Sequence, residues 1–104
     1  MTKICPLPNN VGKVRVIKNI RGITRTFRIV DEIMLLRRQK NPRIVCLQKI
    51  RFLEEKRTEY RFGYYMLGVK PGMWSKWVWG QYSLLIRISE LKKLIKLAKA
   101  KGWV

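Results

Sequence analysis

The chain has 104 residues, and its 24 lysines and arginines against 6 aspartates and glutamates give a formal net charge of +18, with no histidine. This length fits a single basic domain over 1–104, and an apolar fraction of 47% argues against a disordered chain. The absence of histidine excludes histidine-based acid–base catalysis and the serine and cysteine triads that require it.

The N-terminal segment, residues 1–12, contains two prolines and a glycine and is predicted to be a flexible or loop-like arm. Residues 13–18 alternate between basic and apolar side chains, which is typical of a strand with one solvated face. A turn is predicted over 19–22. Residues 30–40 are predicted to form a helix, because good helix formers precede the Asn-Pro stop, although residues 26–30 suit a strand equally well.

Two further strands are predicted at 43–53 and 59–67, which are rich in β-branched and aromatic residues and are separated by a polar connector. A Pro-Gly loop over 68–75 leads to a third strand at 76–82, with an extension to Leu85 as an alternative. The short connections predict a three-stranded antiparallel meander over about 43–85, to which the strand at 13–18 could add.

The C-terminal residues predict an amphipathic helix over about 90–101, with Ser89 as N-cap and Gly102 as the glycine that ends it. Its apolar stripe would cover one face of the sheet. The expected fold class is therefore α+β: a small antiparallel sheet packed by this helix and by the helix at 30–40.

The loop between the strands at 43–53 and 59–67 decides which side chains share a face. A five-residue loop over 54–58 would separate an apolar core face from a basic outer face, whereas a four-residue loop would mix the two. The five-residue version is therefore expected. Its core face holds Cys46, Gln48, Ile50, Phe52, Tyr60, Phe62, Tyr64 and Met66, and its outer face holds Lys49, Arg51, Arg61, Gly63 and Tyr65.

Aromatic residues interleaved with cations mark the candidate binding surface. If Val78 points inward, Trp77 and Trp79 lie beside the basic residues of the outer face, where bases could stack on them. The alternative is that both tryptophans belong to the core or to an oligomer interface. The adjacent loop adds the candidate contacts Lys70, Trp74 and Lys76.

The positive charge is spread over the whole chain, with +8 in residues 1–42, +6 in 43–88 and +4 in 89–104. A basic body of this kind predicts a surface that lies along a polyanion, and nucleic acid, either DNA or RNA, is favoured over an anionic membrane. The further candidate phosphate contacts are Lys13, Arg15, Lys18, Arg37, Arg38 and Arg43. The predicted function is non-catalytic nucleic-acid binding that weakens steeply with salt.

No cofactor or metal is expected, since Cys5 and Cys46 match no disulfide or zinc spacing. No apolar run approaches the roughly 18–20 residues that cross a bilayer, and the first six residues lack a signal-peptide pattern. We therefore expect a cytoplasmic or nucleoid-associated protein.

Two other functions remain open. The first is a small basic subunit of a larger nucleoprotein complex, or a homo-oligomer, in which part of the apolar surface meets a protein. The second is a Mg²⁺-dependent nuclease, because Asp31 upstream of Glu54-Glu55-Lys56 resembles the acid…Glu-x-Lys pattern of restriction-enzyme-type nucleases.

A resemblance of architecture also covers residues 43–102. Three antiparallel strands and one packed helix, with Trp and Arg on the strands, look like the plant ethylene-response type of DNA-binding domain and like integrase arm-binding domains. This resemblance implies DNA reading by a β-sheet and assigns no individual residue.

Overall fold

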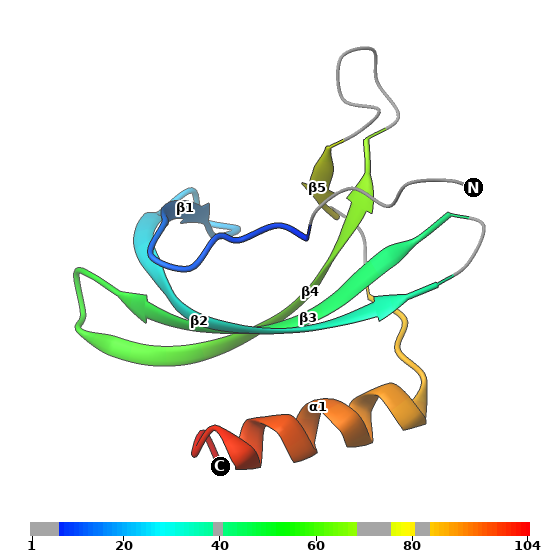
Figure 1. Cartoon of the computed structure of the whole chain (residues 1–104). Coiled ribbons are helices and arrows are strands. Elements are labelled where there is room, and N and C mark those ends of the chain that lie inside the picture. The colour runs from blue at the N-terminus through cyan, green and yellow to red at the C-terminus, as the bar shows by residue number, and fades with distance from the viewer. Residues whose placement is uncertain (1–6, 39–40, 69–75, 81–83) are drawn as a thin grey trace.

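A computed structural model describes residues 7–38, 41–68, 76–80 and 84–104 (Figure 1). It contains one antiparallel sheet, in which each strand pairs with the next along the chain, and one helix at the C-terminal end. The elements are β1 (Val14–Lys18), β2 (Thr24–Arg37), β3 (Arg43–Phe52), β4 (Arg57–Leu67), β5 (Trp77–Trp79) and α1 (Ile88–Ala100). The expected combination of an antiparallel sheet with a C-terminal helix is thus confirmed, but the sheet has five strands rather than three.

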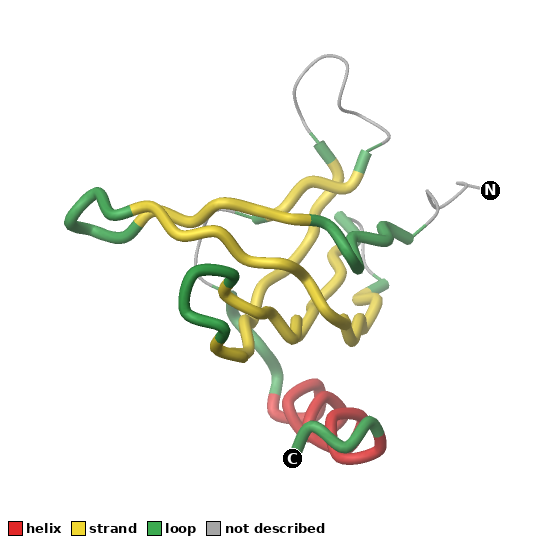
Figure 2. The backbone as a smooth tube through the Cα atoms, turned by 90° about the vertical axis from the view of Figure 1, so that its left-hand side faces the viewer, coloured by secondary structure: helices red, strands yellow, loops and turns green. Residues whose placement is uncertain are grey.

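The sheet curls into a half-barrel, and α1 lies against its outer side (Figures 1 and 2). We call the face that packs against α1 the helix side. Its buried cluster consists of Ile33, Val45, Leu47, Leu94 and Ala98. We call the opposite face the concave side, and its buried residues are Phe27, Ile29, Ile44, Cys46, Gln48, Ile50, Phe52 and Tyr65.

The helix predicted at 30–40 is wrong, because residues 30–37 lie in β2, a 14-residue strand that pairs with β1 and β3, and residues 39–40 lie outside the described part. Apolar residues pack on both sides of β2, with Ile33 on the helix side and Met34 on the concave side. A strand covered on both faces has a nearly continuous apolar run, which cannot be told from a buried helix by its period. A bulge between Ile29 and Asp31 also shifts the alternation by one residue.

The predicted five-residue connection between β3 and β4 is also wrong. Phe52 pairs with Arg57, so the turn holds the four residues 53–56. Directly paired residues point to the same face of a sheet. Tyr60 and Phe62 therefore lie on the helix side with Lys49 and Arg51, and Arg61, Gly63 and Tyr65 lie on the concave side. The expectation of one clean basic face fails because both faces of this sheet carry apolar clusters and polar residues together.

The local predictions at the two ends of the sheet are confirmed. The strand at 13–18 forms β1, and in the turn that follows the Asn19 side-chain oxygen accepts the N–H groups of Arg21 and Ile23 at 2.9 and 3.0 Å. Gly22 has the positive φ of 80° that this turn requires. The third predicted strand, 76–82, is shorter in the structure: β5 spans Trp77–Trp79, Lys76 and Gly80 lie outside it, and the alternative extension to Leu85 is wrong, because residues 84–85 form no strand. Residues 81–83 lie outside the described part.

Helix α1 begins earlier than predicted and ends as predicted. Its N-cap is Arg87 rather than Ser89, and the Glu90 carboxylate accepts the Arg87 N–H at 3.0 Å. At the other end, Gly102 has a φ of +75° and Trp103 N–H donates to the Ala98 carbonyl at 2.9 Å. This pattern ends the helix and folds Trp103 back onto the helix-side cluster. Within the described residues, no helix has the length and apolarity to cross a membrane.

Candidate nucleic-acid interface

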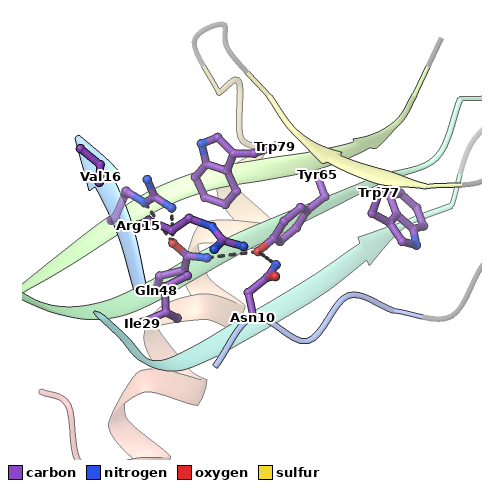
Figure 3. A pocket seen from close by; sticks show the side chains of 9 residues that line it. Asn10, Arg15, Val16, Ile29, Gln48, Tyr65, Trp77 and Trp79 are labelled. Atoms are coloured by element: carbon purple, nitrogen blue, oxygen red, sulfur yellow. Dashed lines mark hydrogen bonds between the residues drawn. The ribbon is translucent and has the colours of Figure 1, made fainter. Parts of the chain in front are cut away.

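The concave side holds a pocket of about 330 Å³ between the two edges of the sheet (Figure 3). Arg15 and Val16 line it from β1, and Trp77 and Trp79 line it from β5. Residues so distant in sequence reach one pocket because the sheet curls and brings its edge strands toward each other. The remaining lining residues are Asn10, Ile29, Gln48, Arg61 and Tyr65.

A network of hydrogen bonds forms the floor of this pocket. The fully buried Gln48 accepts two hydrogen bonds from Arg61, at 2.9 and 2.7 Å, through its side-chain oxygen. Its amide nitrogen donates to the Tyr65 hydroxyl at 3.2 Å and to the Glu32 carboxylate. The Tyr65 hydroxyl donates to Glu32 at 2.9 Å and accepts from the Asn10 amide at 2.7 Å. Asn10 therefore ties the segment before β1 to the sheet, so this part of the predicted arm is anchored.

Aromatic rings hold the Arg61 guanidinium in place. Its central carbon lies 4.1 Å from the centroid of the Trp79 ring and 4.8 Å from that of Phe27. The Trp79 ring also meets Tyr65 edge-on, with 5.1 Å between centroids. This arrangement requires Gly63, because a Cβ there would lie 1.9 Å from the indole of Trp79. The glycine thus allows the tryptophan to lie directly on the strand.

The pocket carries more positive than negative charge. Burial, together with weaker repulsion from Arg15, lowers the pKa of Arg61, but a guanidinium stays protonated in proteins. Within the described residues, neither Arg15 nor Arg61 forms an ion pair with a carboxylate; the hydrogen bond of Arg15 goes to the Val14 carbonyl at 3.2 Å. Glu32 lies behind Gln48 and supplies one negative charge against the two guanidinium groups.

The Tyr65 hydroxyl stays protonated at the centre of the network. Burial raises the pKa of Tyr65, and the hydrogen bond to Glu32 and the charge of that carboxylate raise it further, against the lowering effect of the bond from Asn10. Two buried polar atoms on this side of the sheet, Glu32 Oε1 and Trp77 Nε1, have no hydrogen-bond partner within the described structure. They leave one acceptor and one donor free beside the network.

The structure divides the predicted contact residues between the two faces of the sheet. The register and the pocket lining place Arg15, Arg61, Tyr65, Trp77 and Trp79 on the concave side, and Lys13 is exposed just before β1. The helix side holds Lys18, Arg37, Arg43, Lys49 and Arg51. Arg38 and Lys76 are exposed next to strand ends, and Lys70 and Trp74 lie outside the described residues.

Several helix-side cations already have partners within the protein. Arg37 forms an ion pair with Glu90 at 2.6 Å and donates to the Leu85 carbonyl at 3.0 Å. Arg43 lies over the Tyr64 ring, with 5.2 Å to its centroid. Arg37 in particular is less than one-fifth exposed, so its contacts hold α1 to the sheet.

Sequence reasoning missed four pocket residues: Asn10, Val16, Ile29 and Gln48. Gln48 carried a usable signal, since it is the one amide among the apolar residues Cys46, Ile50 and Phe52 on alternate positions of a strand. A buried amide requires hydrogen-bond partners, which predicts a polar network on that face. Asn10 carried no such signal, because its role depends on Tyr65, 55 residues away.

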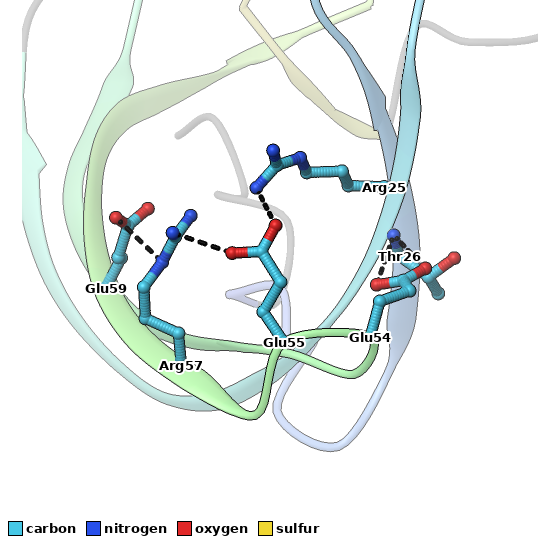
Figure 4. Close-up of polar contacts among 6 residues, drawn as sticks. All are labelled: Arg25, Thr26, Glu54, Glu55, Arg57 and Glu59. Carbon is cyan, nitrogen blue, oxygen red and sulfur yellow. Dashed lines mark hydrogen bonds and ion pairs between the residues drawn. The ribbon is translucent and has the colours of Figure 1, made fainter.

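The carboxylates of the hypothetical nuclease site are separately engaged, and Figure 4 shows two of them, Glu54 and Glu55. Glu54 accepts the Thr26 backbone N–H at 2.9 Å, and Glu55 forms ion pairs with Arg25 and, at 2.7 Å, with Arg57. Asp31 lies on the helix side and pairs with Lys101 at 2.9 Å. Among the described residues, no three Cys, Asp or Glu side chains come close enough to hold a metal ion. These carboxylates therefore act as local ion-pair and hydrogen-bond partners.

No protein-family model, curated protein or solved structure matches this chain. The architectural resemblance of residues 43–102 to known DNA-binding domains thus has no support from a matching sequence or structure.

Proposed function

We propose that this chain is a non-catalytic nucleic-acid-binding protein that contacts nucleic acid with its concave side. The observation that carries the proposal is the pairing of two guanidinium groups, Arg15 and Arg61, with the aromatic rings of Tyr65, Trp77 and Trp79 in one pocket. Cations that attract phosphates and rings on which bases stack are the two components of single-strand recognition.

The distribution of ion pairs supports this assignment. Arg25 and Arg57 also belong to the concave side, but Glu55 and Glu59 neutralise them at the hairpin end (Figure 4). Arg15 and Arg61 have no such carboxylate partner in the described part of the chain. Beyond the pocket, the exposed lysines of α1 add a positive field that would draw a polyanion toward the protein: Lys92, Lys93, Lys96 and Lys99.

The proposal is tested by fluorescence-anisotropy titration of labelled single strands and duplexes at two salt concentrations. Arg15→Gln should weaken binding roughly five- to tenfold, which corresponds to the loss of about 1–1.4 kcal/mol for one phosphate contact. Arg51→Gln is the matched control, since it removes the same charge from an exposed position on the helix side. Absence of salt-sensitive binding to any nucleic acid would refute the proposal.

One observation favours a second candidate, a subunit of a larger nucleoprotein assembly. A groove of about 240 Å³ lies between α1 and the sheet, and apolar side chains line it, among them Tyr60, Phe62, Leu94 and Trp103. Phe62, 51% exposed, and Tyr60, 46% exposed, lie together in this groove and form a contiguous apolar surface of the kind that meets a protein partner. Under this candidate, Phe62→Ser should leave the nucleic-acid affinity of the isolated chain unchanged, because the groove lies on the side of the sheet opposite the pocket.

A further inference from the structure

We infer that the concave pocket receives one unstacked base of a single strand, while Arg15 at its rim holds an adjacent phosphate. This inference rests on the proposed function and adds to it that single strands bind in preference to duplexes. It also predicts that the protein binds with little regard to base identity.

The pocket has a buried floor and an exposed rim, as a recess for a single base requires. Its floor is buried, with Ile29 1%, Gln48 0% and Tyr65 4% exposed, whereas Val16 at the rim is 65% exposed. The bases of a duplex are stacked and paired, so a base must leave the stack before it can enter a recess. The volume, about 330 Å³, lies at the small end of the range of ligand pockets, roughly 300–1,000 Å³. The pocket therefore has room for one small ring system rather than for a duplex.

The walls of the pocket offer surfaces on which a base can stack. Trp77 and Trp79 are partly exposed on the β5 side of the pocket, and the central carbon of the Arg61 guanidinium lies 4.1 Å from the centroid of the Trp79 ring. Bases stack on aromatic rings and on guanidinium planes, and each such stack contributes about 1–3 kcal/mol. An unstacked base entering between Arg15 and the tryptophans would meet surfaces of this kind (Figure 3).

The floor of the pocket explains why base identity should matter little. Both polar atoms of the Gln48 side chain are occupied, the oxygen by Arg61 and the nitrogen by Tyr65 and Glu32. An amide that is already saturated cannot read the edge of a base without breaking the network. The two polar atoms on this side that lack a hydrogen-bond partner in the described structure, Glu32 Oε1 and Trp77 Nε1, are themselves buried. Stacking therefore contributes more to binding than base-edge hydrogen bonds do, and every base has a face that can stack.

We assign the phosphate contact to Arg15 because it lies beside the pocket and has N–H groups available. It is exposed on β1 beside the pocket, and among the described residues its one hydrogen bond, to the Val14 carbonyl, leaves most of its guanidinium N–H groups available. A phosphate follows each base along a strand, so a base in the pocket places the neighbouring phosphate at the rim. A guanidinium binds phosphate with two parallel hydrogen bonds.

The test compares ligands on the unmodified protein, so that no folding defect can confuse it. Anisotropy titrations use labelled single strands of about ten nucleotides, within the range of roughly 4–16 that single-strand domains cover. The set consists of DNA and RNA homopolymers, an abasic DNA strand of equal length and charge, and a duplex. We expect the abasic strand to bind about 5- to 150-fold more weakly than the base-bearing strands, the equivalent of about 1–3 kcal/mol of stacking.

The results of these titrations distinguish base binding in the pocket from nucleic-acid binding in general. If the abasic strand or the duplex binds as tightly as the base-bearing single strands, with the same salt dependence, the pocket takes no base but nucleic-acid binding stands. If no ligand binds, both fail. In a second measurement, Trp77→Leu should lower the affinity for base-bearing strands and leave the abasic strand unaffected. Trp103→Leu, on the helix side, should change neither affinity.

Discussion

Gly63 lies in the middle of β4, directly under the indole of Trp79. A Cβ at this position would stand 1.9 Å from the ring, closer than any real contact allows. Gly80 is placed in the same way on the other side of the sheet, where a Cβ would stand 2.0 Å from the ring of Tyr64. The two glycines therefore form a matched pair: both permit a close approach, but only Gly63 shapes the pocket.

We expect Gly63→Ala to lower the free energy of unfolding by about 1–3 kcal/mol, because overpacking forces the aromatic ring to move. Gly80→Ala should destabilise by a similar amount through Tyr64. Denaturant unfolding measures both effects, and anisotropy titration distinguishes the variants, since only Gly63→Ala should also weaken nucleic-acid binding. A Gly63→Ala variant with wild-type stability would contradict the close packing of Trp79 on β4.

Tyr65 joins the two halves of the floor network through its hydroxyl, which bonds Asn10, Gln48 and Glu32. Tyr65→Phe leaves these three groups with one partner fewer in a buried place, so we expect a loss of about 1–3 kcal/mol in the free energy of unfolding. Tyr60→Phe is the control, because Tyr60 is exposed and should change the stability by less than about 0.5 kcal/mol. Equal effects of the two substitutions in thermal or denaturant unfolding would contradict the network.

At the scale of elements, two ion pairs fasten α1 to β2. Arg37 pairs with Glu90 near the start of the helix, where both side chains are mostly buried, and Asp31 pairs with Lys101 at the other end. The hydrogen bond from Arg37 and, to a smaller degree, that from the Arg87 backbone lower the pKa of Glu90 below its ordinary value of 4.5. The Asp31 pKa is also lowered, since the hydrogen bond from Lys101 and other favourable contacts together outweigh the raising effect of burial.

These shifts predict a loss of stability in acid. A carboxyl whose folded pKa is lowered contributes its full stability above its unfolded pKa, near pH 4.5 for Glu90, and loses it as the pH falls through the folded value. The free energy of unfolding should therefore decrease below about pH 5. Glu90→Gln should lower stability at pH 7 by roughly 1 kcal/mol and flatten the acid dependence.

The measurement is urea unfolding from pH 7 down to pH 3. Glu59→Gln serves as control, because Glu59 pairs with Arg57 on an exposed part of the hairpin. If Glu90→Gln kept the full acid dependence of the wild type, the Arg37–Glu90 pair would not be what fastens the helix.

The helix wrongly predicted at 30–40 shows that local sequence patterns do not determine every element of this fold. The strand β1, the Asn19 turn and the end of α1 each depend on residues within a few positions of each other, and these were predictable. The state of 30–37 depends on β3 and on packing against both sides of β2, to which Ile33 and Met34 contribute. Tertiary contacts override intrinsic helix propensity in such a stretch.

At the scale of the whole molecule, the charge of +18 acts in opposite directions on the free and the bound protein. In the free protein, repulsion among 24 cations opposes compaction, and salt screens it. In a complex with nucleic acid, salt competes with the protein for phosphates. The same ions should therefore stabilise the fold and weaken the complex.

We expect the melting temperature of the free protein to rise between about 0.01 and 0.15 M NaCl, over which the Debye length falls from about 30 to about 8 Å. Differential scanning fluorimetry measures this rise. A double variant, Lys92→Gln with Lys96→Gln, removes two exposed charges of α1 and should show a smaller rise. A melting temperature that does not change with salt would mean that the charges are too far apart to destabilise the fold.

The sequence alone determined the composition of the surface and the local structure: a strongly basic chain, the first strand and its turn, the strand-rich centre and a capped C-terminal helix. These follow from side-chain type and from patterns within a few residues. The tertiary structure decided the register of β3 and β4, the state of 30–37 and the partition of the cations between two faces. Only the curl of the sheet brings Arg15 of β1 and Trp79 of β5 to one pocket. Contacts across 64 positions of the chain depend on how strands pair and bend, which no local pattern encodes.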